Sequence, residues 1–127
     1  MRKFTIFLFI FLVGGCAIKV KDYSDNDSDL ISALVNRGSD VNKEHLVSFI
    51  IDCSSKKQVS DIVSGAVQIG FEDDYISYSE KRKVWSTSLI KSLKLNLEQI
   101  TTNRAQLTLL MPSNGCNPIG WGASVEL

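Results

Sequence analysis

The chain has 127 residues, which is enough for one compact domain and too few for two. Apolar residues make up 44% of the sequence, and 14 basic side chains balance 14 acidic ones. From Cys16 onward the formal charge is −2. This net charge excludes a strongly positive electrostatic potential that would attract nucleic acid, and a generally cationic, membrane-binding surface.

The first fifteen residues have the pattern of an export signal. Arg2 and Lys3 form a short positive region, residues 4–13 form an apolar stretch, and Gly14, Gly15 and Cys16 follow. Ten helical residues cover only about 15 Å, roughly half the hydrocarbon thickness of a bilayer, so a transmembrane span is not expected. The sequence therefore predicts a lipoprotein signal peptide over residues 1–15.

The two glycines before Cys16 resemble the bacterial lipobox, whose cysteine is linked to diacylglycerol and becomes the new N-terminus. Cys16 is the predicted lipidation site, and a multiply acylated cysteine supplies the two or more chains that stable anchoring in a lipid bilayer needs. Ala17 stands where many inner-membrane lipoproteins have Asp, which favours the outer membrane, facing the periplasm. An ordinary secretory signal and a buried N-terminal strand are the alternatives.

Residues 16–28 are predicted to be the lipidated cysteine and a flexible tether. The segment "AIKVKDYSDND" is polar, rich in Asp and without periodicity. The folded domain is expected over residues 29–127. It begins with a short helix that Gly38 ends, because apolar residues share one face from Leu30 onward: Leu30, Ile31, Leu34 and Val35.

A strand and a helix are expected next. From His45, "HLVSFIIDC" alternates with both sides largely apolar, which predicts a central strand covered on at least one face. Ser55 and Gln58 have the spacing of a capping box, and Gly70 ends the helix that follows. Its apolar residues recur at helical spacing: Val59, Ile62, Val63, Ala66 and Val67.

The last part of the chain predicts a hairpin, a helix and a strand. Residues 71–79 and 84–93 are two strand candidates joined by the charged turn 80–83. Asn96 begins a helix that Pro112 ends. The core-facing residues expected here are Leu97, Ile100, Leu107, Leu110 and Met111. A final strand is expected over about 119–126.

After the first helix the predicted order is β-α-β-β-α-β, which is the ferredoxin-like order. The expected fold class is therefore α+β: a ferredoxin-like sandwich with an extra N-terminal helix. Two helices should cover one face of a four-stranded antiparallel sheet. The first and last strands should be central neighbours that run in opposite directions.

This topology brings two cysteines together. Cys53 lies at the end of the first strand and Cys116 just before the last one. In an oxidising periplasm they are expected to form a disulfide, which closes a loop of about sixty residues and is worth on the order of 4 kcal/mol. Two separate buried thiols, and a redox or metal role, are the alternatives.

The sequence has few candidates for catalytic or metal-binding residues. Acid–base or nucleophilic catalysis needs two complementary groups within hydrogen-bond reach, and the only histidine, His45, has no obvious cysteine or serine partner. The sequence has no His-x-x-His or Cys-x-x-Cys spacing and no glycine-rich phosphate loop. No catalytic residue, metal or cofactor is predicted, and no direct contact with nucleic acid.

Aromatic residues are the candidates for binding a partner. Trp121 lies between Gly120 and Gly122, and glycines in a strand suggest close backbone approach, a bulge, or a ring lying over bare backbone. Packing is the simpler interpretation of Trp121. Partner binding is the more specific functional interpretation, because Trp is enriched among interface hot spots. The candidate partner-binding residues are Trp121, Trp85 and His45.

Several short segments at ordered spacing are informative together: "GSDVNKEHLVSFIID", Gly70-Phe71, Trp85 at a strand start, residues 97–104, and Gly115 followed by Gly120-Trp121-Gly122. Over about residues 29–126 they resemble the RraB domain, the regulator of ribonuclease E activity. The resemblance implies a ferredoxin-like α+β domain without catalytic activity, which acts by binding a protein. In the best-known members that partner is cytoplasmic ribonuclease E.

This sequence differs from those members in two ways: it has an export leader, and it lacks their strongly acidic net charge. A lipoprotein in the periplasm cannot meet a cytoplasmic nuclease in its mature form. The expected function is therefore a non-enzymatic, membrane-tethered module that binds a protein partner of the cell envelope. Two alternatives stay open: a ribonuclease E inhibitor in the cytoplasm if the leader is not processed, and a small ligand-binding protein or enzyme of the envelope.

Overall fold

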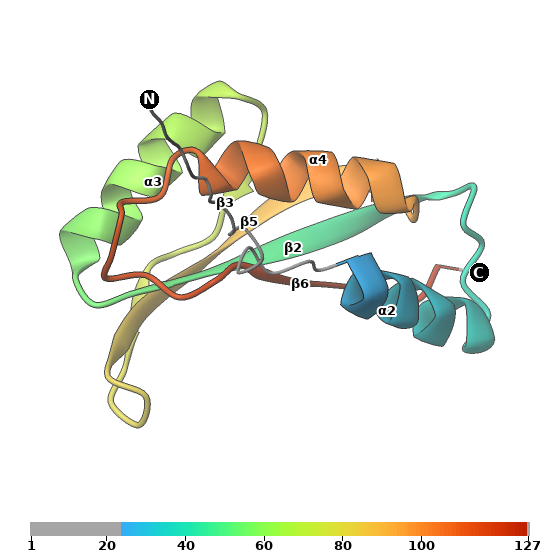
Figure 1. Cartoon of the computed structure of the whole chain (residues 1–127), viewed down its shortest axis with the longest axis horizontal. Coiled ribbons are helices and arrows are strands. Elements are labelled where there is room, and N and C mark those ends of the chain that lie inside the picture. The colour runs from blue at the N-terminus through green and yellow to red at the C-terminus, as the bar shows by residue number, and fades with distance from the viewer. Residues whose placement is uncertain (1–23, 127) are drawn as a thin grey trace, which may run out of the picture.

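The computed structural model describes residues 24–126 of the chain (Figure 1). The predicted signal peptide at 1–15, the lipidation site Cys16 and residues 17–23 of the predicted tether lie outside the described residues. Among the helices described, none is long and apolar enough to cross a membrane.

Helix α2 covers Ser24–Asn36 and begins earlier than predicted. Residues 24–28, predicted as tether, are helical, which corrects the boundary of the domain. The physical reason is that Asp27 is buried, so contacts with distant parts of the chain hold this polar segment. Leu34 packs inward as predicted, whereas Val35 is exposed.

Strand β2 (Glu44–Cys53) buries every second residue. The buried residues are His45, Val47, Phe49, Ile51 and Cys53. Leu46, on the opposite side of the strand, is 65% exposed. A strand has a side-chain period of two, so β2 has one face in the core and one toward solvent.

Helix α3 (Lys56–Gln68) begins with the predicted capping box. The Ser55 side chain accepts a hydrogen bond from the Gln58 backbone N–H at 3.2 Å, and Gln58 Oε1 accepts one from the Ser55 backbone N–H at 3.2 Å. Gly70, with φ +100°, follows the helix in the left-handed conformation that glycine favours. Val59, Ile62 and Ala66 form the buried face.

The predicted strand over 71–79 is divided into two short strands, β3 (Glu72–Asp73) and β4 (Ser77–Ser79). Both pair antiparallel with β5 (Val84–Lys94), so the predicted hairpin is present. The Thr87 hydroxyl donates to the backbone oxygens of Asp74 and Tyr75, at 3.1 and 3.2 Å, where the strand is interrupted.

Helix α4 (Leu97–Thr108) is capped by Asn96, whose Oδ1 accepts from the Gln99 backbone N–H at 3.2 Å. Ile100 and Leu107 are buried as predicted, but Leu97 is exposed. The last strand, β6 (Gly120–Ala123), is shorter than the predicted range of 119–126.

The fold is α+β, with three helices and an antiparallel sheet of five strands among the described residues. The strand order is β3-β5-β2-β6, and β4 also pairs with β5. The first and last strands are antiparallel neighbours, as predicted. The prediction that both are central is wrong: β6 lies at the edge, because the hairpin returns β5 to the other side of β2.

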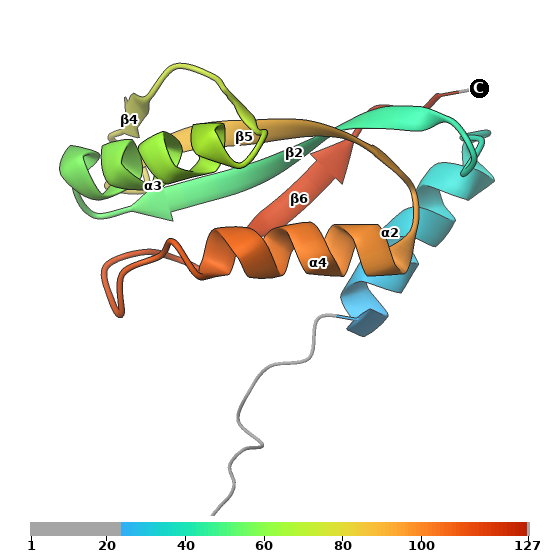
Figure 2. The ribbon, with the colours of Figure 1, turned by 90° about the horizontal axis from the view of Figure 1, so that it is seen from above.

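Helices α3 and α4 cover the same face of the sheet, and α2 lies beside α4 (Figures 1 and 2). The core fills the space between this helical layer and the sheet. No helix of residues 24–126 lies over the other face of the sheet, which carries small and aliphatic side chains: Leu46, Ser48, Ile50, Ser88, Ile90 and Ser92.

Candidate protein-binding site

Trp121 belongs to a buried polar cluster that joins three elements. Its indole Nε1 donates a hydrogen bond to Oδ1 of Asp27 at 3.0 Å. Arg104 donates from Nη1 to the same oxygen at 3.0 Å, and its Nη2 bonds the other oxygen. The side chains of Asp27 and Arg104 are 4% and 8% exposed. One carboxylate therefore links α2, α4 and β6 through charge-assisted hydrogen bonds.

A shallow cleft of about 280 Å³ opens over this cluster. It is lined by Asn26, Asp27, Leu30, Arg104, Pro118, Ile119, Gly120 and Trp121. A Cβ at Gly120 or Gly122 would meet no described atom within 4 Å. Among the described residues, the expected close backbone approach or covering ring at these glycines is therefore wrong.

Packing accounts for the position of Trp121. The half-buried ring packs against the core, and its N–H has an acceptor in Asp27. The remaining exposed part of the ring faces the cleft. Partner binding by Trp121 stays a prediction.

Trp85 lies in a separate cluster on β5. Its ring centroid is 5.0 Å from that of Tyr78, and Lys56 Nζ lies 5.7 Å from it. Trp85 pairs with Cys53 on one side of β2, whereas Trp121 pairs with Phe49 on the other. The two tryptophans therefore do not form one site.

His45 is 1% exposed, and its predicted role in binding a partner stays a prediction. Its Nδ1 lies 2.8 Å from the backbone oxygen of Lys43, and its Nε2 lies 3.3 Å from Ser39 Oγ. Ser39 Oγ also accepts from the Glu126 backbone N–H at 2.9 Å. The serine partner that the sequence did not reveal is six residues away, in the turn after α2, and the histidine has a structural role there.

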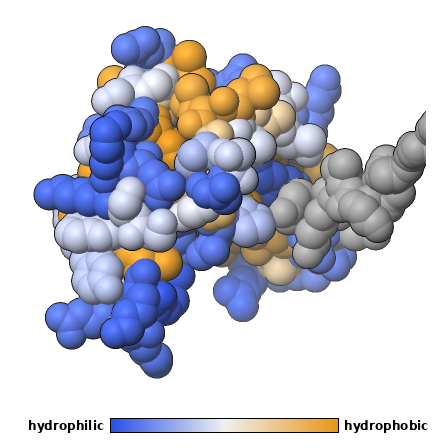
Figure 3. Space-filling model, turned by 60° about the vertical axis from the view of Figure 1, so that its left-hand side comes forward, coloured by the Kyte–Doolittle hydropathy of each residue, from blue (hydrophilic) through white to orange (hydrophobic). Residues whose placement is uncertain are grey.

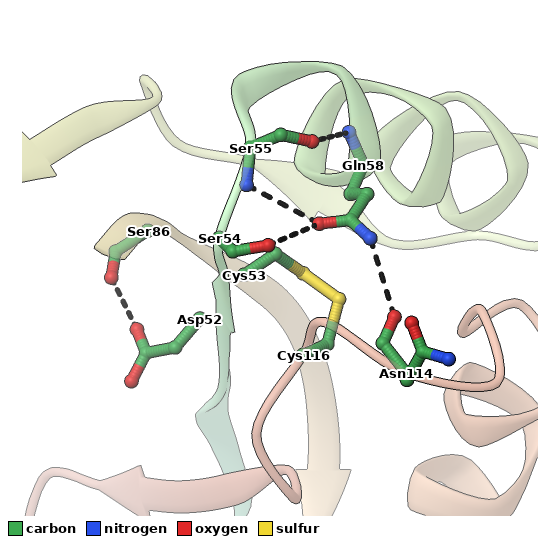
Figure 4. The surroundings of a disulfide bond; sticks show 8 residues. All are labelled: Asp52, Cys53, Ser54, Ser55, Gln58, Ser86, Asn114 and Cys116. Atoms are coloured by element: carbon green, nitrogen blue, oxygen red, sulfur yellow. Dashed lines mark hydrogen bonds between the residues drawn. A yellow bond between two sulfur atoms is a disulfide. The ribbon is translucent and has the colours of Figure 1, made fainter. Parts of the chain in front are cut away.

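The predicted disulfide between Cys53 and Cys116 is present (Figure 4). Gln58 lies beside it and joins the start of α3 to the loop before β6. Its Oε1 accepts from the Ser54 hydroxyl at 3.2 Å, and its Nε2 donates to the Asn114 backbone oxygen at 3.3 Å (Figure 4). The disulfide and this amide together hold the loop at the end of β2.

The environment of the Asp52 carboxyl changes its pKa. Burial raises its pKa, since the side chain is only 12% exposed, but hydrogen bonds from Arg82 and Ser86 and the positive charge of Arg82 outweigh that effect. The pKa of Asp52 therefore lies below its ordinary value. Arg82 Nη1 is 2.8 Å from the carboxylate, so this ion pair fixes the β4–β5 turn to β2.

Within residues 24–126 no group of three or more His, Cys, Asp or Glu side chains is arranged to hold a metal ion. The surface of the described residues carries aromatic rings, exposed lysines and one open face of the sheet.

Comparison with known families gives a match over most of the chain. The family model described as "Regulator of ribonuclease activity B", RraB, matches residues 24–123. The matched region begins at the first residue of α2 and ends at the last residue of β6, so it contains every helix and strand described. No curated protein matches the sequence.

Proposed function

The chain belongs to the RraB family, and from this premise we propose that it is a regulator that binds a protein partner of the cell envelope while a lipid anchors it to the membrane. The observation that carries the proposal is the extent of the family match, which includes all of α2 to β6. A regulator-like, protein-binding module follows from the family. The anchor and the envelope partner are further steps.

The anchor is supported by the pattern at the start of the chain. Two glycines precede Cys16 after a short apolar stretch, as in a lipobox. Because α2 begins at Ser24, only residues 17–23 separate the lipidated residue from the domain. Extended chain spans at most about 3.5 Å per residue, so these residues would hold the domain within about 25 Å of the bilayer.

The envelope partner follows from the compartment. A domain held on the periplasmic side of a membrane meets envelope proteins, and an oxidising compartment is where a disulfide such as Cys53–Cys116 persists. The family description favours a second candidate, regulation of a ribonuclease. That function requires the chain to remain in the cytoplasm with its leader retained.

Radioactive palmitate labelling with membrane fractionation separates the two. In the native host, the wild-type chain should incorporate label and sediment with membranes, whereas Cys16→Ala should do neither. An unmodified chain that starts at Met1 and stays in the soluble extract would overturn the anchor. The ribonuclease candidate would then lead, and slower cleavage of a ribonuclease E substrate when the chain is added would support it.

A further inference from the structure

The β4–β5 hairpin and the start of α3 carry an aromatic and basic surface. We define the hairpin surface by Lys56, Tyr78, Lys81, Lys83 and Trp85. The turn projects from the sheet, away from α2 (Figure 1). In Figure 3, hydrophilic side chains project at the lower end of the molecule, where Figure 1 places this turn.

The aromatic pair is held in place and partly open to solvent. Trp85 is half-buried against the core, and Tyr78 packs on it with a centroid distance of 5.0 Å while 44% of Tyr78 stays exposed. Tyr and Trp that are fixed before binding lose little conformational freedom on association, which is one reason why they are enriched in interfaces.

The charges around this pair are mainly positive. Lys56, Lys81 and Lys83 are exposed, and Glu80 is the opposing charge within the turn. Lys81 and Lys83 have no carboxylate of the described residues within ion-pair distance, whereas the guanidinium of Arg82 is bound to Asp52. Three lysines against one glutamate give a local positive charge on a chain whose total charge is zero.

We propose that the hairpin surface is where the partner docks and that it takes an acidic segment of that protein. The proposal rests on the proposed function and adds to it the surface and the chemistry of the partner. Carboxylates of the segment would lie against Lys56, Lys81 and Lys83, and its apolar groups against the exposed part of Tyr78. Such complementary charge gives orientation and speed to association more than affinity.

A protein segment fits this surface better than the two other anionic partners. The Trp85 ring already contacts Tyr78 and Lys56, so it offers no free stacking platform of the kind that single-stranded nucleic acid uses. A membrane surface is disfavoured because strand β4 of the hairpin and the start of α2, where the proposed lipid tether enters, lie toward opposite sides of the molecule in Figure 2.

Site-specific photo-crosslinking of the full chain in its native host tests the proposal. The photoreactive residue p-benzoylphenylalanine replaces Tyr78, on the hairpin surface, in one variant. Leu46, on the open face of the sheet, and Leu109, after α4, are replaced in two others, because both are well exposed. Tyr78→p-benzoylphenylalanine is expected to give a protein adduct whose crosslinked peptide, identified by mass spectrometry, has a net negative charge.

Charge reversal supplies the matched control. Lys56→Glu with Lys81→Glu should lower the yield of the adduct at position 78 by about tenfold, as expected for charge-steered association. Arg37→Glu with Lys94→Glu changes the total charge by the same amount at distant exposed positions and should leave the yield unchanged. Lys81→Glu alone, in the exposed turn, gives a smaller loss and replaces the double variant if that one does not fold.

The other outcomes overturn the proposal. A lipid or nucleic-acid adduct at position 78, a neutral or basic crosslinked peptide, or a yield that charge reversal does not change would each contradict it. Protein adducts only at positions 46 or 109 would place the partner on another surface and leave the proposed function standing. No protein adduct at any of the three positions would overturn both.

Discussion

The single carboxylate of Asp27 links three elements of the fold, α2, α4 and β6. It accepts hydrogen bonds from Arg104 on α4 and from Trp121 on β6, which are 77 and 94 residues away in the chain. A buried ion pair contributes little compared with an apolar pair, but loss of one partner leaves an uncompensated charge. Asp27 therefore helps to hold helix α2 on the domain.

Removal of this carboxylate should destabilise the protein strongly. Asp27→Ala removes the carboxylate that binds the buried Arg104 guanidinium and should lower the free energy of unfolding by about 3–5 kcal/mol, measured by urea denaturation. Trp121→Phe removes one hydrogen bond and keeps the ion pair, so it should cost about 1.5–3 kcal/mol. An Asp27→Ala variant as stable as the wild type would show that α2 is not held by this contact.

Asp52 predicts a dependence of stability on pH. Its pKa in the folded protein lies below that of the unfolded chain, because Arg82 and Ser86 bind the ionised carboxylate. The contribution of Asp52 to the free energy of unfolding is therefore fully present above its pKa in the unfolded chain, near 3.8. This contribution is lost as the pH falls through the pKa of Asp52 in the folded protein.

Thermal unfolding between neutral pH and about pH 3 measures this contribution. The Asp52→Asn variant should lose less stability than the wild type as the pH falls below about 4, because its amide does not titrate there. The other carboxyl groups titrate in both proteins, so their effect on stability is the same in the two pH profiles. Parallel pH profiles for the two proteins would contradict the prediction.

At the scale of elements, local contacts explain why most of the helices and strands could be predicted. The capping box of α3 involves residues three apart, and the hairpin joins strands that are neighbours in the chain. Ser55, Gln58 and Asn96 carry these signals in the sequence itself. The sequence pattern does not predict that Arg104 is buried and Leu97 exposed. The burial of a helix residue depends on which neighbour its helix packs against, and α4 packs against α2.

The two residues of the capping box should differ in their effect. Ser55→Ala removes one cap hydrogen bond and should cost about 1 kcal/mol of unfolding free energy. Gln58→Ala should cost about 1–2 kcal/mol, because it also removes the bonds to Ser54 and Asn114.

Chemical denaturation of both single variants measures the difference between them. Lys57→Ala is the control, since its ion pair with Asp61 is on the surface of the same helix. Equal losses for Ser55→Ala and Gln58→Ala would show that the link between α3 and the 114–116 loop does not stabilise the protein.

At the scale of the whole molecule, the sheet order required long-range information. The chain order predicted which strands pair, and β2 does pair with β6, but it did not predict that β6 is an edge strand. The position of His45 shows the same limit. Its partner Ser39 is close in the chain, and the same hydroxyl also binds the backbone of the distant Glu126.

The disulfide should be a large part of the global stability. Cys53 and Cys116 are 63 residues apart, and in the chain-entropy model a loop of this length is worth about 4 kcal/mol. Cys53→Ala with Cys116→Ala should lower the melting temperature, measured by circular dichroism. A reducing agent should lower the melting temperature of the wild type and leave that of the double variant unchanged.

The same covalent bond has a consequence for proteolysis. The exposed turn at 80–83 contains Lys81, Arg82 and Lys83, and it lies inside the ring of chain that the two sulfurs close. If trypsin cut the backbone there once, the two pieces would still migrate as one molecule until the sulfurs were reduced. A nicked protein would keep both halves attached to whatever its N-terminus holds.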